Sequence, residues 1–564
     1  TEIKAQTLAE PKPGRWTFDL GQNMVGYARL KVTAPAGREV TLRFAEMLNP
    51  DGTVYTTNYR SARCTDEYTC RGGGEEVWEP TFTFRGYRYV ELTGLAAKPA
   101  LDAVTGVVIG SDAPQTGTFE CSEPRLNQLQ HNIVWGQRGN FVSVPTDCPQ
   151  RDERLGWTGD AQIFVRTATF NNQVGGFFTK WLVDLDDAQG ANGAYPDVAP
   201  RVAAGEGTAA WGDAGVVCPW TVYQAYGDQR LLADHYPNMV RWVEYCRQHS
   251  KDLLRPAAGY GDWLSIGANT PTDVLATAYF ARSTELTAKA AGVLGKTDDE
   301  AKYKALWQDI AQAFQKAYVQ PDGRIKGNTQ TCYLLALRFG LLPEAQHAAA
   351  AKYLCDDIEQ RGWRLSTGFV GVGHLLPTLT QIGRDDVAWK LMLQDAFPSW
   401  LFSVKHGATT IWERWDGWTP DKGFQDAGMN SFNHYSFGSC GEWMYANILG
   451  IAPDVDQPGS AGQADGVGYR HIVVQPRPGG GVTSAKGSYR SGYGIIATDW
   501  KLVDGKMTLS VTVPVGVTAR VILPAGVTTE SGKPLAKAEG VKVLSTSAEA
   551  TTCEVGSGTW RFAP

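Results

Sequence analysis

The chain has 564 residues, of which 43% are hydrophobic and 20% are charged, and its formal net charge is -6. This balance is typical of a folded protein of about two to four domains and excludes wholesale disorder. The sequence has no block of basic residues that would bind a phosphate backbone and no apolar stretch near the roughly 20 residues that cross a bilayer, so we expect neither nucleic acid nor a membrane as a partner.

The first predicted region is an antiparallel β domain over residues 1–112. Apolar residues alternate along it, as in Ala28, Leu30 and Val32, and turn residues separate the alternating stretches. Because alternation places every second side chain on one face of a strand, that face can be buried. We therefore expect a β-sandwich at the amino-terminal end.

After residue 112 the spacing of apolar residues changes to three and four. This spacing predicts a linker helix at residues 113–130 and a helical domain over residues 131–452. The clearest helix is predicted at residues 297–319, where Thr297 and Glu300 form a capping-box pattern. No convincing series of strands separates the helices, so we expect helices packed on helices rather than a βαβ fold.

Alternation returns at the carboxyl-terminal end. Met507, Leu509 and Val511 follow a turn signal, and this pattern predicts a second β-sandwich domain over residues 453–564. The expected organisation is therefore a central all-α domain between two β domains.

The ten cysteines are scattered, without CxxC pairs or histidines at zinc spacing, so we expect free thiols. Cys64 and Cys70 are the one close pair, and we expect no bond between them. No EF-hand loop is present, and no metal or cofactor is expected. Residues 1–15 lack the pattern of a signal peptide, which leaves both a cytoplasmic and a periplasmic location open. Both a monomer and a homodimer are open as well.

Two stretches combine carboxylates with tryptophans. Residues 145–162 read PTDCPQRDERLGWTGDAQ, and residues 409–443 read TTIWERWDGWTPDKGFQDAGMNSFNHYSFGSCGEW. Sugar hydroxyls donate to carboxylate oxygens, while the apolar face of a sugar ring lies on an aromatic plane. These residue types together predict a carbohydrate site.

Cleavage of a glycosidic bond requires two carboxyl groups in different protonation states. One carboxyl group protonates the leaving oxygen, and the other is ionised. A carboxyl group against indole walls lies in an apolar environment, which raises its pKa. Both stretches supply candidates for these roles.

At these residues the chain resembles the α-L-rhamnosidases of glycoside hydrolase family 78. The resemblance is carried by DCPQRDERLGWTGDAQ, by ATTIWERWDGW and by MNSFNHYSFGSCGEW. It continues through LSTGFVGVGHLLPTL, PSWLFSVKHGATT, RSGYGIIATDW and FRGYRYVELTG. The resemblance thus covers essentially the whole chain.

The resemblance implies an (α/α)6 barrel flanked by an amino-terminal and a carboxyl-terminal β-sandwich domain. It implies an exo-acting enzyme that hydrolyses terminal α-L-rhamnose from small-molecule or oligosaccharide rhamnosides with inversion. Glu153 would be the general acid and Glu413 the general base. The residues implied to bind the substrate are Asp147, Trp157, Asp160, Trp211, Trp263 and His434. Many family members have further amino-terminal β domains, whereas this chain has room for one before the barrel.

Several alternatives stay open at this point. Asp152 competes with Glu153 for the role of acid, and Asp416 competes with Glu413, which could instead form a structural ion pair with Arg414. Two other functions are a lyase that cleaves a rhamnose-glucuronate linkage by β-elimination and a rhamnoside-binding protein that lacks catalysis.

Overall fold

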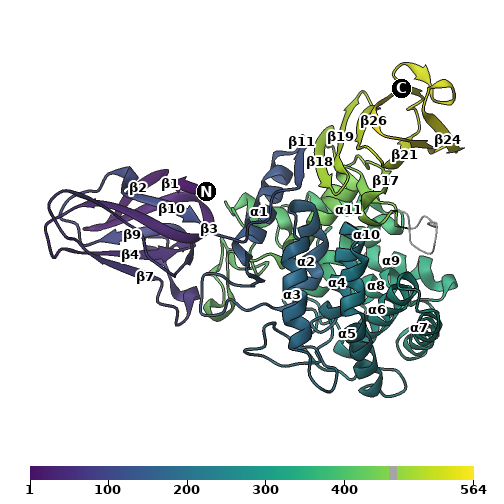
Figure 1. Cartoon of the computed structure of the whole chain (residues 1–564), viewed down its shortest axis with the longest axis horizontal. Coiled ribbons are helices and arrows are strands. Elements are labelled where there is room, and N and C mark those ends of the chain that lie inside the picture. Colours follow the sequence, from purple (N-terminus) through teal and green to yellow (C-terminus); the bar gives the residue numbers. More distant parts are fainter. Residues whose placement is uncertain (456–465) are drawn as a thin grey trace. The chain divides into compact units, whose positions relative to one another are not determined.

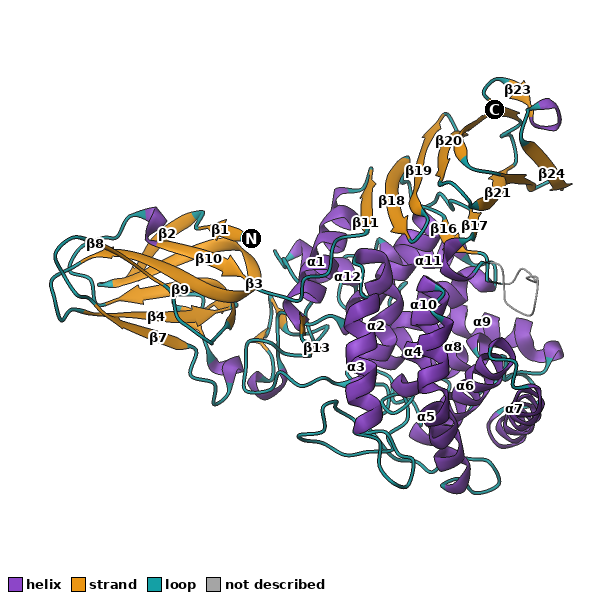
Figure 2. Cartoon of the chain, in the orientation of Figure 1, coloured by secondary structure: helices purple, strands orange, loops and turns teal. Residues whose placement is uncertain are grey.

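The chain folds into sheet-rich parts at both ends of the sequence and a helical part between them. A computed structural model describes residues 1–455 and 466–564 (Figure 1, Figure 2). The described residues form two compact units. The first comprises Thr1–Asp112, His131–Trp157 and Phe402–Gly438, and the second comprises Ala113–Gln130, Thr158–Leu401 and Ser439–Pro564. The amino-terminal sheet therefore shares its unit with two segments from the middle of the chain.

The amino-terminal sheet is antiparallel and is built around one long strand. This strand, β3 (Arg15–Thr33), pairs with β2, β8, β9 and β10. Its residues Ala28, Leu30 and Val32 are buried in the core, as the alternation predicts. The other strands are β1 (Glu2–Lys4), β2 (Thr7–Lys12), β4 (Glu39–Ala45), β7 (Thr65–Thr69), β8 (Glu75–Trp78), β9 (Arg85–Thr93) and β10 (Val104–Val108). A separate pair consists of β5 (Met47–Leu48) and β6 (Val54–Tyr55).

The middle of the chain is helical. Its strands among the described residues are the two-residue pairs β12 (Phe141–Val142) with β13 (Val144–Pro145) and β14 (Trp418–Thr419) with β15 (Gly423–Phe424). The helices are α1 (Pro124–Asn140), α2 (Thr158–Asn171), α3 (Gly175–Asp187), α4 (Ala214–Tyr226), α5 (Gln229–Gln248), α6 (Thr272–Val293), α7 (Thr297–Tyr318), α8 (Gln330–Arg338), α9 (Glu344–Gln360), α10 (Phe369–Gln381), α11 (Asp385–Met392), α12 (Trp400–Lys405) and α13 (Gly441–Trp443).

The predicted helix at residues 297–319 is confirmed, but its predicted capping box is wrong. The helix α7 begins at Thr297 itself, and Lys296 is the N-cap residue, without a side-chain cap hydrogen bond. The Thr297 hydroxyl therefore lies within the first turn instead of before it, where a capping side chain has to stand.

Two sheets form the carboxyl-terminal part. The first begins with β11 (Gly117–Cys121), which pairs with β18, so the linker helix predicted at residues 113–130 is wrong for its first part and the helix α1 begins at Pro124. Its remaining strands are β18 (Ser484–Ser491), β19 (Gly494–Val503), β20 (Lys506–Val513), β26 (Gly558–Ala563), β22 (Thr529–Glu530) and β23 (Lys533–Pro534). The second sheet contains β16 (Ile451–Pro453), β17 (His471–Val474), β21 (Thr518–Pro524), β25 (Ala550–Val555) and β24 (Val541–Thr546).

The predicted fold class is confirmed: a helical domain stands between two sheet-rich domains in chain order (Figure 2). All ten cysteines are free and buried, so the expectation for Cys64 and Cys70 is also confirmed. Among the described residues, every helix is too short or too polar to span a bilayer.

Candidate active site

The first predicted catalytic segment is a closed loop that precedes α2. The backbone N–H of Asp147 donates to the Leu155 carbonyl at 3.1 Å, and the Leu155 N–H donates to the Asp147 carboxylate at 3.0 Å. Arg154 has a positive φ of 60°, and its guanidinium donates to the Pro149 and Phe84 carbonyls, both at 2.9 Å. These bonds fix the loop that carries Glu153.

The second predicted segment pairs with itself in antiparallel fashion. The His434 N–H donates to the Ile411 carbonyl at 2.7 Å, and the Glu413 N–H donates to the Ser431 carbonyl at 2.9 Å. The Ser431 N–H in turn donates to Oε2 of Glu413 at 2.8 Å. The backbone of Glu413 and its carboxylate are therefore both held by Ser431.

The two predicted catalytic glutamates meet at Arg151. Nη2 of Arg151 lies 2.8 Å from Oε2 of Glu153 and 3.3 Å from Oε1 of Glu413. The Arg151 side chain is only 1% exposed. One buried cation thus balances two carboxylates that are far apart in the sequence. Arg151 and Arg154 both stand near Glu153 in the sequence and are candidate partners for it, but nothing in the sequence indicates that Arg151 also contacts Glu413.

The Glu153 carboxyl group has a pKa below its ordinary value. Burial raises this pKa, but the charges of Arg151 and Arg60 and hydrogen bonds with Asp147 and Trp157 lower it by more. Nε1 of Trp157 donates to Oε1 of Glu153 at 3.1 Å. The expectation that an indole wall raises the pKa is therefore wrong for Glu153 in this structure, because the indole presents its N–H and a hydrogen bond to the carboxylate favours the charged form.

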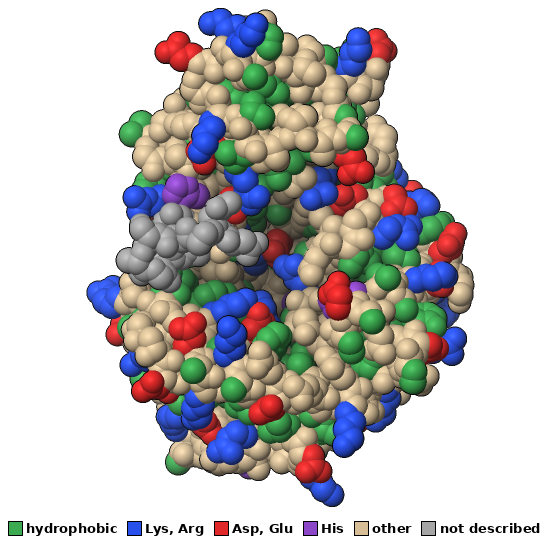
Figure 3. Space-filling model, turned by 90° about the vertical axis from the view of Figure 1, so that its right-hand side faces the viewer, with side chains coloured by type: hydrophobic (Ala, Val, Ile, Leu, Met, Phe, Trp, Pro, Cys, Tyr) green, Lys and Arg blue, Asp and Glu red, His purple; other side chains and the backbone are tan. Residues whose placement is uncertain are grey.

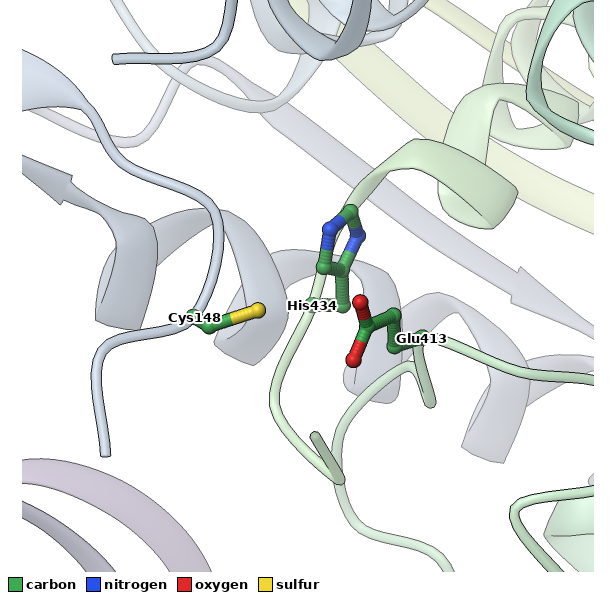
Figure 4. Close-up of side chains that lie close together, drawn as sticks. All are labelled: Cys148, Glu413 and His434. Carbon is green, nitrogen blue, oxygen red and sulfur yellow. The ribbon is translucent and has the colours of Figure 1, made fainter. Parts of the chain in front are cut away.

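His434 and Cys148 lie beside Glu413, and Figure 4 shows the three side chains around one common space. One polar atom from each lies within 4.8 Å of the others. The Ser436 N–H donates to Nδ1 of His434 at 3.2 Å, so the neutral imidazole carries its proton on Nε2. Burial raises the pKa of the Cys148 thiol well above its ordinary value, and the charge of Asp147 adds to this effect.

The competing carboxylates have other partners. Asp152 accepts hydrogen bonds from the backbone N–H and the hydroxyl of Ser61. Asp416 is held by both Nε and Nη2 of Arg414, at 2.9 and 3.3 Å. The cation expected as a structural partner of Glu413 therefore binds Asp416 instead. These contacts favour Glu153 and Glu413 over their neighbours.

The remaining predicted site residues lie in the second unit. Asp160 is buried in the first turn of α2. Trp211 packs against Gly159, where an added Cβ would come within 2.6 Å of the indole ring. Trp211 and Trp263 both contact the ring of Tyr260, with centroids 4.8 and 6.1 Å apart. The second unit thus gathers two predicted aromatic residues around a third.

The sequence analysis missed Tyr260 and its partner Asp197. The Tyr260 hydroxyl donates to Oδ2 of Asp197 at 2.8 Å, and burial raises the pKa of this aspartate. The available signal was the short GYGDW stretch, which contains both Tyr260 and the predicted Trp263.

A separate cavity of the second unit, of about 930 Å³, contains none of the predicted site residues. Figure 3 shows the face that includes α7 and α9, with basic and acidic side chains around a hollow. In the cavity lining, Arg282 and Lys289 both pair with Glu285 at 2.7 Å. These charges largely compensate one another.

Comparisons with known proteins agree with the domain organisation described above. The model of the bacterial α-L-rhamnosidase 6 hairpin glycosidase domain matches residues 114–448. The models of the bacterial α-L-rhamnosidase concanavalin-like domain and C-terminal domain match residues 9–110 and 450–537. Together these matches follow the β, helical and β regions of the chain.

Two curated relatives are named α-L-rhamnosidase. The one from Streptomyces avermitilis is 52% identical and covers 100% of this chain and 53% of the relative. The one from Formosa agariphila is 43% identical and covers 93% of this chain and 57% of the relative. The chain thus spans little more than half the length of these curated relatives.

Solved structures of α-L-rhamnosidases also match this chain. The Streptomyces avermitilis α-L-rhamnosidase complexed with L-rhamnose matches with a TM-score of 0.95 and 51% identity, over 100% of this chain and 53% of that chain. The Aspergillus terreus enzyme matches with a TM-score of 0.91 and 34% identity, over 100% of this chain and 63% of that chain. The chain therefore belongs to the bacterial α-L-rhamnosidases of glycoside hydrolase family 78.

Proposed function

We propose that this chain carries the catalytic site of an exo-acting α-L-rhamnosidase, which hydrolyses terminal α-L-rhamnosides with inversion. The observation that carries the proposal is the pair Glu153 and Glu413 on the shared guanidinium of Arg151. Two carboxyl groups on either side of a scissile bond are what glycoside hydrolysis requires. The 51% identical relative solved with L-rhamnose supports rhamnose as the sugar.

Glu153 is the proposed general acid. Its side chain is 14% exposed, so a bound substrate can displace the water that reaches it. Loss of that water strengthens the desolvation that already raises the pKa of Glu153 and favours the protonated acid. The proton then passes to the glycosidic oxygen as the bond to the anomeric carbon breaks.

Glu413 is the proposed general base. It is nearly enclosed, and the Ser431 N–H and Arg151 bind one carboxylate oxygen each. These donors orient the Glu413 carboxylate, so that it can take a proton from a water that attacks the anomeric carbon. Attack from the side opposite the leaving group inverts the anomeric centre.

The other predicted residues suit a deoxy sugar. Within the first unit, the Asp147 carboxylate can accept from a sugar hydroxyl and Nε2 of His434 can donate to one, and Asp160 of the second unit is a carboxylate of the same kind. Nη1 of Arg151 is buried without a hydrogen-bond partner among the described residues and offers a further donor. The indole of Trp157 in the first unit, and those of Trp211 and Trp263 in the second, are each the kind of apolar surface on which a sugar ring and its methyl group pack.

The test uses p-nitrophenyl α-L-rhamnopyranoside and proton NMR of the released rhamnose. We expect the β-anomer first, with the α-anomer appearing only by mutarotation. If the α-anomer appears first, the enzyme retains configuration and the role of Glu413 as base is wrong. An ultraviolet-absorbing product from a rhamnose-glucuronate oligosaccharide, without water uptake, would favour the lyase alternative.

A further inference from the structure

A loop of the amino-terminal β domain reaches the proposed acid. Arg60 follows β6, and its backbone has a positive φ of 56°. Its Nη2 lies 3.1 Å from Oε2 of Glu153, the oxygen that also binds Arg151. The Arg60 guanidinium is held in place by a hydrogen bond of 2.8 Å from Nε to the Gly428 carbonyl.

The next residue of this loop extends the contact. Ser61 donates to Asp152 through its backbone N–H and its hydroxyl, and Nη1 of Arg60 lies 3.8 Å from Asp152. Two neighbouring residues of the β domain thus bind two neighbouring carboxylates of the catalytic loop. This matched pair of contacts fixes the position of Glu153 relative to the β domain.

A second part of the β domain reaches the segment that holds the proposed base. Glu46, directly after β4, is 1% exposed, and its Oε2 accepts from the Phe432 N–H at 3.1 Å and from Nδ2 of Asn58 at 3.0 Å. Nδ2 of Asn58 also donates to the Asn430 carbonyl at 3.1 Å. Residues 430 and 432 stand on either side of Ser431, whose N–H binds Glu413.

Glu46 and Arg60 both form contacts outside the β domain, in addition to any contacts within it. Asn23 completes the arrangement around Glu46, because its Nδ2 donates to Oε1 of Glu46 at 3.1 Å and also contacts the hydroxyl of Thr410 at 3.2 Å. The polar side chains on this edge of the β domain are therefore directed at the two catalytic segments. An accessory domain that only binds carbohydrate has no need of such contacts.

We propose that the amino-terminal β domain is a working part of the catalytic site, in which Arg60 positions the proposed acid Glu153 and Glu46 positions the proposed base Glu413 through Ser431. This inference rests on the proposed function. Both are positioning residues, since each acts through another side chain or the backbone. The division of the chain supports the inference, because the β domain and both catalytic segments belong to one compact unit.

The first test replaces Arg60 in the full chain by alanine and by lysine, and uses Arg63→Ala as the matched control. Arg63 lies in the same loop but pairs with Glu67, and its side chain is 73% exposed. The readout is the pH dependence of kcat/KM on the aryl rhamnoside. A role in loop folding alone would lower activity without moving the pH profile.

The charged and titratable groups that face Glu153 are Arg151, Asp147, Arg60, Cys148 and, across Arg60, Asp152. Loss of the Arg60 charge raises the pKa of Glu153, so the acid stays protonated to higher pH. We expect Arg60→Ala to move the alkaline limb of kcat/KM upward by about one pH unit and to lower kcat about tenfold or more. Arg60→Lys should keep the alkaline limb of the kcat/KM profile near its original pH. If Arg60→Ala changes neither this limb nor kcat, the proposed role of Arg60 is wrong.

The second test compares Glu46→Gln and Glu46→Ala with Glu91→Gln. Glu91 is an equally buried glutamate of the same domain, but it pairs with Arg15 and Arg43. We expect both Glu46 variants to lower kcat about 10- to 100-fold with a smaller change in KM. Glu91→Gln should keep the kcat of the unchanged chain, even if its melting temperature falls as much as those of the Glu46 variants. If the Glu46 variants and the control have the same kcat, the role of Glu46 is wrong.

Different results would contradict the proposed function and the proposed role of the β domain. If Glu153→Gln and Glu413→Gln keep turnover, the proposed function is wrong. If these two are inactive while Arg60→Ala and Glu46→Gln match their controls, the proposed function stands and only the role of the β domain is overturned.

Discussion

The segments around Glu153 and Glu413 place the same side chain in two different environments. Glu153 is partly exposed and contacts two arginines and an indole N–H, and these contacts hold its pKa below the ordinary value. Glu413 is enclosed and is held by Arg151 and by the backbone of Ser431. The accessible carboxyl group suits the proposed acid, which has to meet a leaving oxygen, and the enclosed one suits the proposed base. Neighbours rather than residue type therefore separate the two proposed roles.

The largest expected effect comes from removing either carboxyl group. We expect Glu153→Gln and Glu413→Gln each to lower kcat on an aryl rhamnoside by about 1,000-fold or more, because each removes proton transfer in the transition state. The substitutions keep the size of the side chain, so circular dichroism should change little, whereas the loss of a charge beside buried Arg151 lowers the melting temperature. Near-normal turnover by either folded variant would remove that glutamate from the mechanism.

The next effect tests the bridge that the two segments share. Arg151→Ala leaves the buried Glu413 without its cation and Glu153 with Arg60 alone, and should cost about 3–5 kcal/mol of unfolding free energy. We expect urea denaturation to reveal this loss and kcat to fall at the same time. A combination of Arg151→Ala with Glu153→Gln should be less destabilised than the sum of the single variants, because the removed groups interact. Strict additivity would mean that the bridge contributes little.

A smaller effect distinguishes the surroundings of the two glutamates. Trp157→Phe keeps an aromatic wall but removes the N–H that donates to Glu153, so the pKa of Glu153 should rise. We expect the alkaline limb of kcat/KM to move upward by a fraction of a pH unit, while the acidic limb stays in place. A shift of the acidic limb instead would assign Trp157 to the base.

A separate expected effect concerns stability as a function of pH. Burial raises the pKa of Glu46 to about 7, although hydrogen bonds from Asn23, Phe432 and Asn58 lower it. A folded-state pKa above the unfolded value of about 4.5 means that the folded protein binds the extra proton. This contribution to stability is present below about pH 4.5 and is lost as the pH rises to about 7. Melting temperatures of Glu46→Gln should show less decline over this range than those of the unchanged chain.

Much of the fold could be predicted from the sequence, because it depends on local periodicity. The alternation of Leu30 and Val32 and the helical spacing after Thr297 both correspond to observed elements. β11 was missed because it is only five residues long: Thr118 and Glu120 alternate with Phe119 and Cys121, but so short a stretch forms a strand only by pairing with β18. The predicted capping box failed because the start of α7 differs by one residue from the position that the pattern requires.

The same distinction between local and tertiary features applies to the residues of the candidate site. Glu153 and Glu413 could be named because their chemistry and motifs are local features of the sequence. Arg60 and Glu46 could not, because each stands in an ordinary strand connection and acquires its role only by contact with residues 153 and 432.

The sequence by itself thus determined the order of the β and helical domains, the family and the two candidate carboxylates. The tertiary structure alone decided that one arginine joins these carboxylates, that the pKa of Glu153 is lowered rather than raised, and that the β domain contacts both catalytic segments. The physical reason is that periodicity and residue type act over a few neighbours, whereas charge pairing and desolvation depend on groups that only folding brings together.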